Sequence, residues 1–286
     1  MTILQFNLPL PLPDFSMDEG DNLYLIVDGS KIPLLSRELM LADIDAYFSA
    51  VYSFPPWEQL REVSPFVVEA TPSIIDWFTA LETADVGYFF SSELEPFDLT
   101  HHLVTLAEGI TPYGGKVMFK MAHPEGAWVL FEDESPLLWQ GISKVWIPVQ
   151  GEWQVKSHPK NLPSPKAEKL VFTEQQWQSF GDISWRNTQK MIYRHMVKWF
   201  PERLGASDNP VDWVASWANA AYQKGFGVHS DLLSFFNVLG YLGESAINQP
   251  VYPDIYHLIQ QPSLMTPSQR IERAAELAEA YAKQGK

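Results

Sequence analysis

The stretch that decides the fold is Leu23-Tyr-Leu-Ile-Val-Asp28, closed by Gly29. An uninterrupted apolar run of this length, bounded by a turn signal, predicts a strand buried in a sheet that is covered on both faces. Similar patterns predict further strands at 65–69, 86–91 and 116–121, and a hairpin over 142–155 that turns near Gln150-Gly151.

Segments with a helical spacing of apolar residues separate these strands, at 32–52, 73–82 and 96–108. Ser73 and Asp76 form the capping pattern of the second helix, and Gly109 ends the third. Strands that alternate with helices predict an α/β or α+β lobe with a small mixed sheet.

The back half of the chain is predicted to be entirely helical. Capping boxes at Thr173–Gln176 and Thr266–Gln269, and the cap Asn209 before Pro210, each open a helix. The predicted domains are an extended or poorly ordered N-terminal segment 1–22, an α/β domain 23–155, a Pro/Lys linker 156–169 and a helical lobe 170–286.

Charge divides the chain in the same way. Residues 1–150 contain 22 Asp and Glu against six Lys and Arg, a net charge of −16, whereas residues 151–286 have a net charge of +1. Two lobes with different partners are indicated, and the acidic field repels nucleic acid and anionic membranes. The absence of cysteine excludes disulfides and thiolate chemistry. We find neither a signal-peptide pattern nor an apolar run long enough to cross a bilayer, so the expected location is the cytoplasm.

Motifs that carry chemistry are weak in this sequence. The run 109–116 resembles a phosphate loop, but its spacing is wrong by one residue and it follows a predicted helix. His101 and His102 are adjacent, so on a helix their side chains point in different directions and share a metal poorly. His123 is interpreted as a turn residue before Pro124, and the acidic run 132–134 as a solvated turn. No cofactor or metal is predicted.

One enzymatic alternative stays open. Asp28 ends a predicted strand, where α/β proteins often carry their chemistry, and a small hydrolase or transferase could use Asp28 with Ser91 and Ser92. Asp28 could equally accept hydrogen bonds in the following turn, with the help of Ser30. The sequence lacks a Gly-x-Ser-x-Gly elbow. We therefore favour a protein that is not an enzyme.

Partner contacts are the remaining expectation. Trp and Tyr side chains are enriched at interface hot spots, and the helical lobe is crowded with aromatic residues. The candidate contact residues are Glu132, Asp133, Glu134, Trp199, Trp217 and Phe226.

The chain resembles the type VI secretion effector adaptors, known as Tap or Tec chaperones, through an ordered series of short motifs. The motifs are Leu23-Tyr-Leu-Ile-Val-Asp-Gly-Ser30, Ser64-Pro-Phe-Val-Val68, Asp76-Trp-Phe78, Gly87-Tyr-Phe-Phe-Ser-Ser92, His102-Leu103 and Val117-Met-Phe-Lys-Met-Ala-His-Pro124. Gln223–Asp231 and Leu239–Gly243 resemble the helical extension of many members. Lys120 stands where the family usually has Arg, and His123 where it usually has Asp.

The resemblance implies a non-catalytic cytoplasmic protein that binds the N-terminal region of a toxic effector and helps to load it onto the C-terminal region of the VgrG spike. It does not say which lobe binds which partner. An immunity protein that neutralises the toxin in the producing cell is a further alternative, beside the enzyme.

Overall fold

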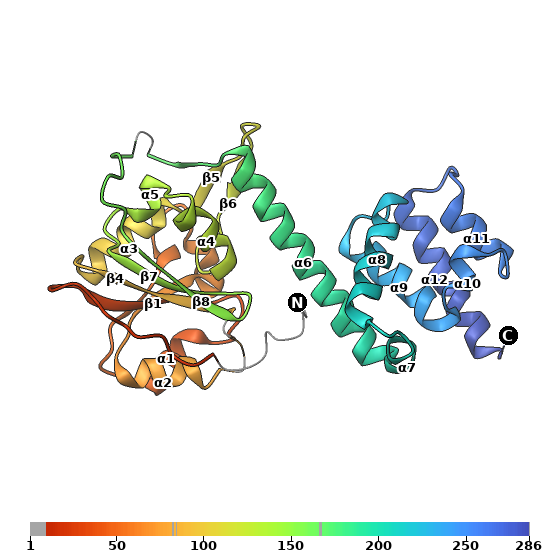
Figure 1. The fold of residues 1–286 in the computed structure, drawn as a ribbon, viewed down its shortest axis with the longest axis horizontal. Helices are drawn as coiled ribbons and strands as arrows, with labels where there is room; N and C mark the ends of the chain where they lie inside the picture. Colours follow the sequence, from red (N-terminus) through yellow and green to blue (C-terminus); the bar gives the residue numbers. More distant parts are fainter. Residues whose placement is uncertain (1–9, 82, 84, 166–167, 286) are drawn as a thin grey trace. The chain divides into compact units, whose positions relative to one another are not determined.

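The structure is a computed structural model that describes residues 10–81, 83, 85–165 and 168–285. These residues divide into two compact units, one ending at Ile183 and the other beginning at Ser184. The first unit combines strands with helices, and helices make up the second (Figure 1). The α+β class predicted from the sequence is confirmed.

A six-stranded sheet organises the first unit. Its order is β2-β3-β1-β4-β7-β8, and every neighbouring pair is antiparallel. The strands are β1 (Asn22–Asp28), β2 (Phe48–Ala50), β3 (Pro65–Glu69), β4 (Gly87–Ser92), β7 (Lys144–Val149) and β8 (Glu152–Ser157). β7 and β8 form the predicted hairpin, which turns at Gln150 and Gly151, both with positive φ.

Helices cover both faces of this sheet (Figure 1). Leu25 and Val27 of β1 pack with residues of α1 (Leu35–Ala42) and α2 (Pro72–Thr79). Tyr24 and Ile26, which point to the opposite face, pack with residues of α3 (Pro96–Thr105), α4 (Pro124–Glu132) and α5 (Pro136–Trp139). Burial on both faces explains why β1 is apolar at successive positions.

Tertiary pairing overrides several local predictions. The predicted helix 32–52 is helical only in α1; it continues as β2, which pairs with β3, and the short turns η2 (Val51–Ser53) and η3 (Glu58–Val63) follow. The predicted cap Ser73 is also wrong, because the Thr71 hydroxyl accepts the hydrogen bond from the Ile74 amide, 3.3 Å away, and α2 begins at Pro72.

A second, three-stranded sheet accounts for the mixed pairing. Its order is β6-β5-β9, with β5 (Glu108–Ile110) antiparallel to β6 (Lys116–Met118) and parallel to β9 (Leu170–Val171). The predicted strand 116–121 is therefore shorter and belongs to this sheet. The predicted helix 96–108 ends at Thr105, because β5 takes up its last residue.

The N-terminal segment is held against the large sheet. Residues 10–21 form neither helix nor strand, yet the Trp146 indole donates to the Asp14 carbonyl at 3.1 Å and the Trp153 indole to the Pro11 carbonyl at 2.9 Å. The Phe15 ring packs edge-on against Phe89 and Trp146. The described part of this segment is therefore fastened to the sheet by its main-chain carbonyls and by Phe15. Residues 1–9 lie outside the described residues.

The long helix α6 (Glu174–Trp199) begins in the first unit and continues into the second. Its capping box is confirmed, since Gln176 and Thr173 exchange hydrogen bonds of 2.9 and 3.1 Å. Residues 170–183 belong to the first unit because β9 pairs with β5 and Phe180 packs on Phe119. The units thus divide inside α6, and the linker proposed at 156–169 stays a prediction.

The second unit is a helical bundle. Its further helices are α7 (Pro201–Gly205), α8 (Pro210–Gln223), α9 (His229–Leu242), α10 (Ser245–Asn248), α11 (Pro253–Gln260) and α12 (Pro267–Lys283). Asn209 caps α8, and Thr266 and Gln269 form the capping box of α12, as predicted. α9 and α12 pack together around a core that includes Phe235, Leu239 and Ile271.

Candidate functional site

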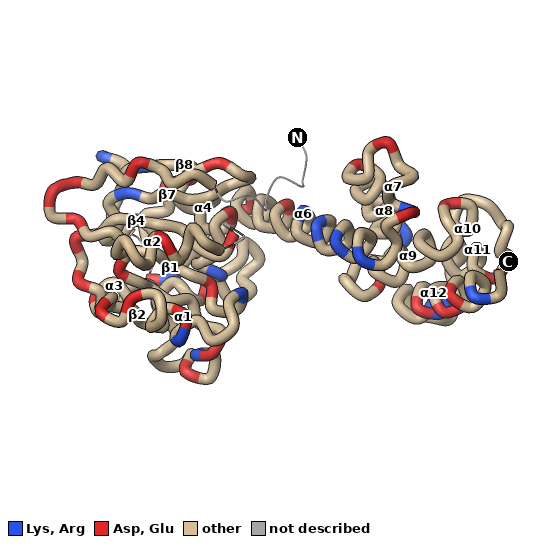
Figure 2. The backbone as a smooth tube through the Cα atoms, turned by 90° about the horizontal axis from the view of Figure 1, so that it is seen from below, with Lys and Arg blue, Asp and Glu red and all other residues tan. Residues whose placement is uncertain are grey.

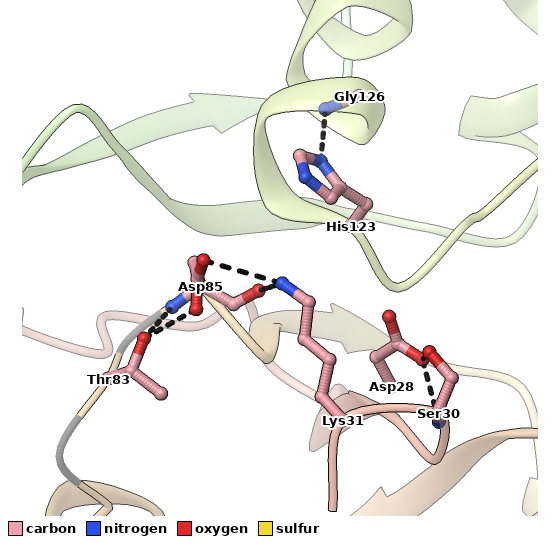
Figure 3. Close-up of polar contacts among 7 residues, drawn as sticks. All are labelled: Asp28, Ser30, Lys31, Thr83, Asp85, His123 and Gly126. Atoms are coloured by element: carbon pink, nitrogen blue, oxygen red, sulfur yellow. Dashed lines mark hydrogen bonds and ion pairs between the residues drawn. The ribbon is translucent and has the colours of Figure 1, made fainter. Parts of the chain in front are cut away.

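The end of β1 carries a buried carboxylate in a turn. Asp28 is 7% exposed, and its Oδ1 accepts hydrogen bonds from the Ser30 amide at 2.9 Å and the Ser30 hydroxyl at 2.6 Å (Figure 3). This is the turn-forming role that the sequence left open for Asp28 and Ser30. One oxygen of the carboxylate is thus engaged within its own turn.

Lys31 joins this turn to the loop before β4. Its Nζ donates to the Asp85 carbonyl at 2.5 Å and lies 3.4 Å from the Asp85 carboxylate, which also accepts from the Thr83 hydroxyl (Figure 3). Burial alone would raise the pKa of Asp85, but Lys31 and Thr83 outweigh it and hold the pKa below its usual value. The pair fastens two loops whose residues are 54 positions apart.

His123 completes the cluster as the N-cap of α4. Its Nδ1 accepts a hydrogen bond from the Gly126 amide at 3.2 Å (Figure 3). Burial, followed by the nearby Lys31 cation, lowers the pKa of His123 below its usual 6.5, although Glu125, Asp85 and Asp28 act in the opposite direction. The ring is therefore neutral at pH 7 and keeps the acceptor that the cap needs. His123 thus performs the capping role for which Asp is well suited.

The proposed strand-end site of Asp28, Ser91 and Ser92 is not assembled. β1 and β4 are antiparallel, with Val27 opposite Gly87 and Asn22 opposite Ser92. Asp28 and the two serines therefore lie at opposite ends of the sheet, about 15–20 Å apart at the usual rise per strand residue. The Ser91 hydroxyl donates to the Asp21 carboxylate at 2.7 Å, and the Ser92 hydroxyl to the Gly141 carbonyl.

Sequence reasoning missed the grouping of Lys31, Asp85 and His123 around Asp28. The three lie in different loops, and no spacing rule relates them; the Asp-to-His departure from the family pattern was the one available signal. Among the described residues, no three His, Asp or Glu side chains are placed to hold a metal ion. The arrangement that the structure does show is a set of contacts that fixes loop positions.

The other weak motifs also have structural roles. Residues 109–116 span β5, β6 and their connecting turn, where the Gly115 amide donates to the Thr111 hydroxyl at 3.0 Å. The run is thus a hairpin between two strands, rather than the helix-to-strand turn that the sequence suggested. His101 stacks on Phe97, whereas burial lowers the pKa of its neighbour His102. The two histidines therefore have different surroundings, as their helical spacing requires.

The acidic run is partly engaged within the first unit. The Asp133 carboxylate accepts from the Gln176 side chain at 2.7 Å, and the Glu134 carboxylate lies 3.1 Å from the Lys156 ammonium. The same ammonium donates to the main-chain carbonyl of Glu132. The run is thus exposed and consists of the last residue of α4 and the turn that follows, and two of its three carboxylates make intramolecular contacts.

The three aromatic candidates of the second unit have different surroundings. Trp199 is 60% exposed, with Lys198 over its ring, and it lines a hollow of about 570 Å³ together with residues of α7. Trp217 is half-buried, and its indole shares the Glu244 carboxylate with that of Trp213. Phe226 is wholly buried in the bundle core, beneath Arg270, so it is not on the surface where a contact residue would lie.

The comparisons with known proteins support the family resemblance. The sequence model of a family described as "Domain of unknown function (DUF4123)" matches residues 23–137. The chain is 38% identical over 268 residues to "Accessory protein VasW" of Vibrio cholerae serotype O1 (strain ATCC 39315 / El Tor Inaba N16961). The aligned region covers 93% of this chain and 91% of that protein. The chain belongs to the DUF4123 family of VasW-like type VI secretion accessory proteins.

The resemblance to the Tap adaptors is thereby confirmed. The match to VasW extends well beyond the DUF4123 region, so most of the helical unit takes part in the similarity. No solved structure matches the chain significantly. None of the described helices is both long and apolar enough to span a membrane.

Proposed function

We propose that this protein is a non-catalytic cytoplasmic adaptor that binds a type VI secretion effector and promotes its loading onto the VgrG spike. The observation that carries the proposal is the similarity to accessory protein VasW over 93% of the chain. Identity of 38% over that length supports a shared accessory role as well as a shared fold. The polar cluster of Asp28, Lys31, Asp85 and His123 consists of contacts that cap a helix and hold loops together. It gives no support to the alternative of a hydrolase or transferase.

The charges of the two units support a protein with two kinds of partner. Acidic residues are spread over the elements of the first unit (Figure 2). On the part of α6 that belongs to the second unit, basic residues recur every fourth position, at Arg186, Lys190, Arg194 and Lys198 (Figure 2). This spacing places them on one side of the helix. The two units therefore suit surfaces of opposite charge.

Trp199 is the aromatic side chain that we propose as a contact. An exposed Trp beside a hollow can serve as an anchor or accept one, and both arrangements are common in interface hot spots. Trp217 is a second candidate. In the acidic run, we propose Glu132 as the contact residue, because the carboxylates of Asp133 and Glu134 already interact with Gln176 and Lys156 within the unit.

The test is to co-express the full chain with the effector encoded beside its gene, with and without the C-terminal region of VgrG. We expect a complex of chain and effector that survives size-exclusion chromatography. The Trp199→Ala variant should weaken one of the two associations, whereas Tyr222→Ala, which removes a ring of similar exposure, should weaken neither. If the chain associates with neither protein, the proposal is wrong.

A further inference from the structure

A groove runs along one free edge of the large sheet. β2 is the last strand on that side, and a hollow of about 600 Å³ lies beside it. All three residues of β2 line the hollow. Since successive strand side chains point to opposite faces, a hollow that meets three in a row follows the edge of the sheet rather than one face. Leu34, Leu35 and Phe66 line it too, and Arg61 and Glu62 contribute charged side chains.

The backbone of β2 presents hydrogen-bonding groups to this groove. The Glu69 amide donates to the Tyr47 carbonyl at 2.8 Å, so Tyr47 and Glu69 form a hydrogen-bonded pair. Along an antiparallel ladder, hydrogen-bonded pairs alternate with pairs that are not hydrogen-bonded. Ser49 therefore exchanges its backbone bonds with Val67 of β3. The N–H and C=O groups of Phe48 and the N–H of Ala50 point away from β3, on the side of the groove, whereas the Ala50 carbonyl begins the turn η2. Such groups are what an additional strand would pair with.

One of the apolar side chains that line the groove is strongly exposed. Leu34, the N-cap residue of α1, has a left-handed backbone with φ of 55° and is 69% exposed. A left-handed Leu costs free energy that Gly or Asn would avoid, and strained residues of this kind concentrate at functional sites. Strain and exposure together mark Leu34 as a contact residue.

The charge of the surrounding unit indicates the kind of partner. The lining of the groove has one cation and one carboxylate, Arg61 and Glu62, but residues 1–150 have a net charge of −16, and Figure 2 shows acidic residues near α1 and β2. An acidic surface favours a segment with positive flanks. An edge strand recognises an extended backbone, and the neighbouring hollow accepts apolar side chains.

We propose that the groove of β2 binds an extended, apolar segment of the effector, flanked by Lys or Arg, as an additional strand of the sheet. This inference rests on the proposed function and names the surface by which it is carried out. Leu34 supplies an apolar contact, and the outward amides of Phe48 and Ala50 supply main-chain hydrogen bonds.

Two variants of the full chain test the two kinds of contact separately. The substitution Leu34→Asn suits the left-handed backbone but removes the apolar contact. We expect it to weaken binding of the effector encoded beside the gene by about tenfold or more. Ala50→Pro removes one outward amide at a position whose φ of −76° proline accepts, and should also weaken binding. The matched control is Leu264→Asn, at an exposed loop position of the second unit, which should change nothing.

Hydrogen exchange supplies the second readout. In the complex, the amides of Phe48 and Ala50 should exchange at least tenfold more slowly than in the free chain. If the effector binds, but both variants bind normally and these amides stay unprotected, the groove proposal is overturned while the adaptor function stands. If the effector does not bind the wild-type chain at all, the proposed function and the groove proposal fall together.

Discussion

Protonation of His123, the N-cap of α4, should destabilise the first unit as the pH falls below the usual pKa of histidine. Burial and Lys31 lower the pKa of His123 in the folded protein below its usual 6.5, so the unfolded chain takes up the proton first. The stabilising contribution is then fully present above pH 6.5 and is lost as the pH falls through the folded pKa. A protonated imidazole cannot accept from the Gly126 amide, and loss of an N-cap contact typically costs about 1 kcal/mol.

The substitution His123→Asn isolates this effect, because the amide oxygen can cap the helix without titrating. Urea unfolding followed by tryptophan fluorescence should give similar stability for both proteins at pH 7.5. At pH 5 the wild type should have lost about 1 kcal/mol more than the variant. Burial also lowers the pKa of His102, which acts equally in both proteins and cancels in the comparison. Parallel losses in the two proteins would refute the reasoning about His123.

Four further outcomes are expected, three of them from substitutions at particular positions and one from the dependence of binding on salt. Leu34→Asn should raise the free energy of unfolding of the first unit by up to about 1 kcal/mol in urea, since it relieves a left-handed Leu. Gly181→Ala, in open space on α6, should stabilise by about 0.5–1 kcal/mol, whereas Gly240→Ala should lower the melting temperature, because its Cβ would lie 2.4 Å from the Phe200 ring. In surface plasmon resonance, one of the two associations, with effector or with spike, should slow strongly between low and moderate salt, and Glu132→Lys should affect that one alone. Equal, flat salt profiles would assign the acidity to solubility.

Buried apolar runs predicted strands correctly, and capping patterns predicted the starts of α6, α8 and α12, although the cap of α2 is Thr71 and not Ser73. β1, β3 and β4 have apolar residues at successive positions because helices cover both faces of the sheet. A run of this kind can be recognised in the sequence alone. Asn209 and Thr266 cap helices through local hydrogen bonds, which depend on neighbours three residues away. Such features need no knowledge of distant contacts.

The failures arose where distant segments decide local structure. Phe48–Ala50 has a helical spacing of apolar residues but becomes a strand because β3 is available to pair with it. The antiparallel register of β1 and β4 separates Asp28 from Ser91 and Ser92, and a sequence that predicts both strands does not state their relative direction. Burial of Phe226 likewise depends on how α9 and α12 pack, which helical period alone does not determine.

The way in which the N-terminal segment is fastened has a practical consequence for anyone who trims the chain. Its hydrogen bonds to Trp146 and Trp153 use main-chain carbonyls, which every amino acid offers, so a profile built from residue identities has little to detect there. The family match accordingly starts at residue 23 and stops at 137, before β7 and β8. A fragment cut at those limits would uncover Phe89 and remove two strands of the sheet. The region that a sequence profile recognises is thus smaller than the region that must fold together.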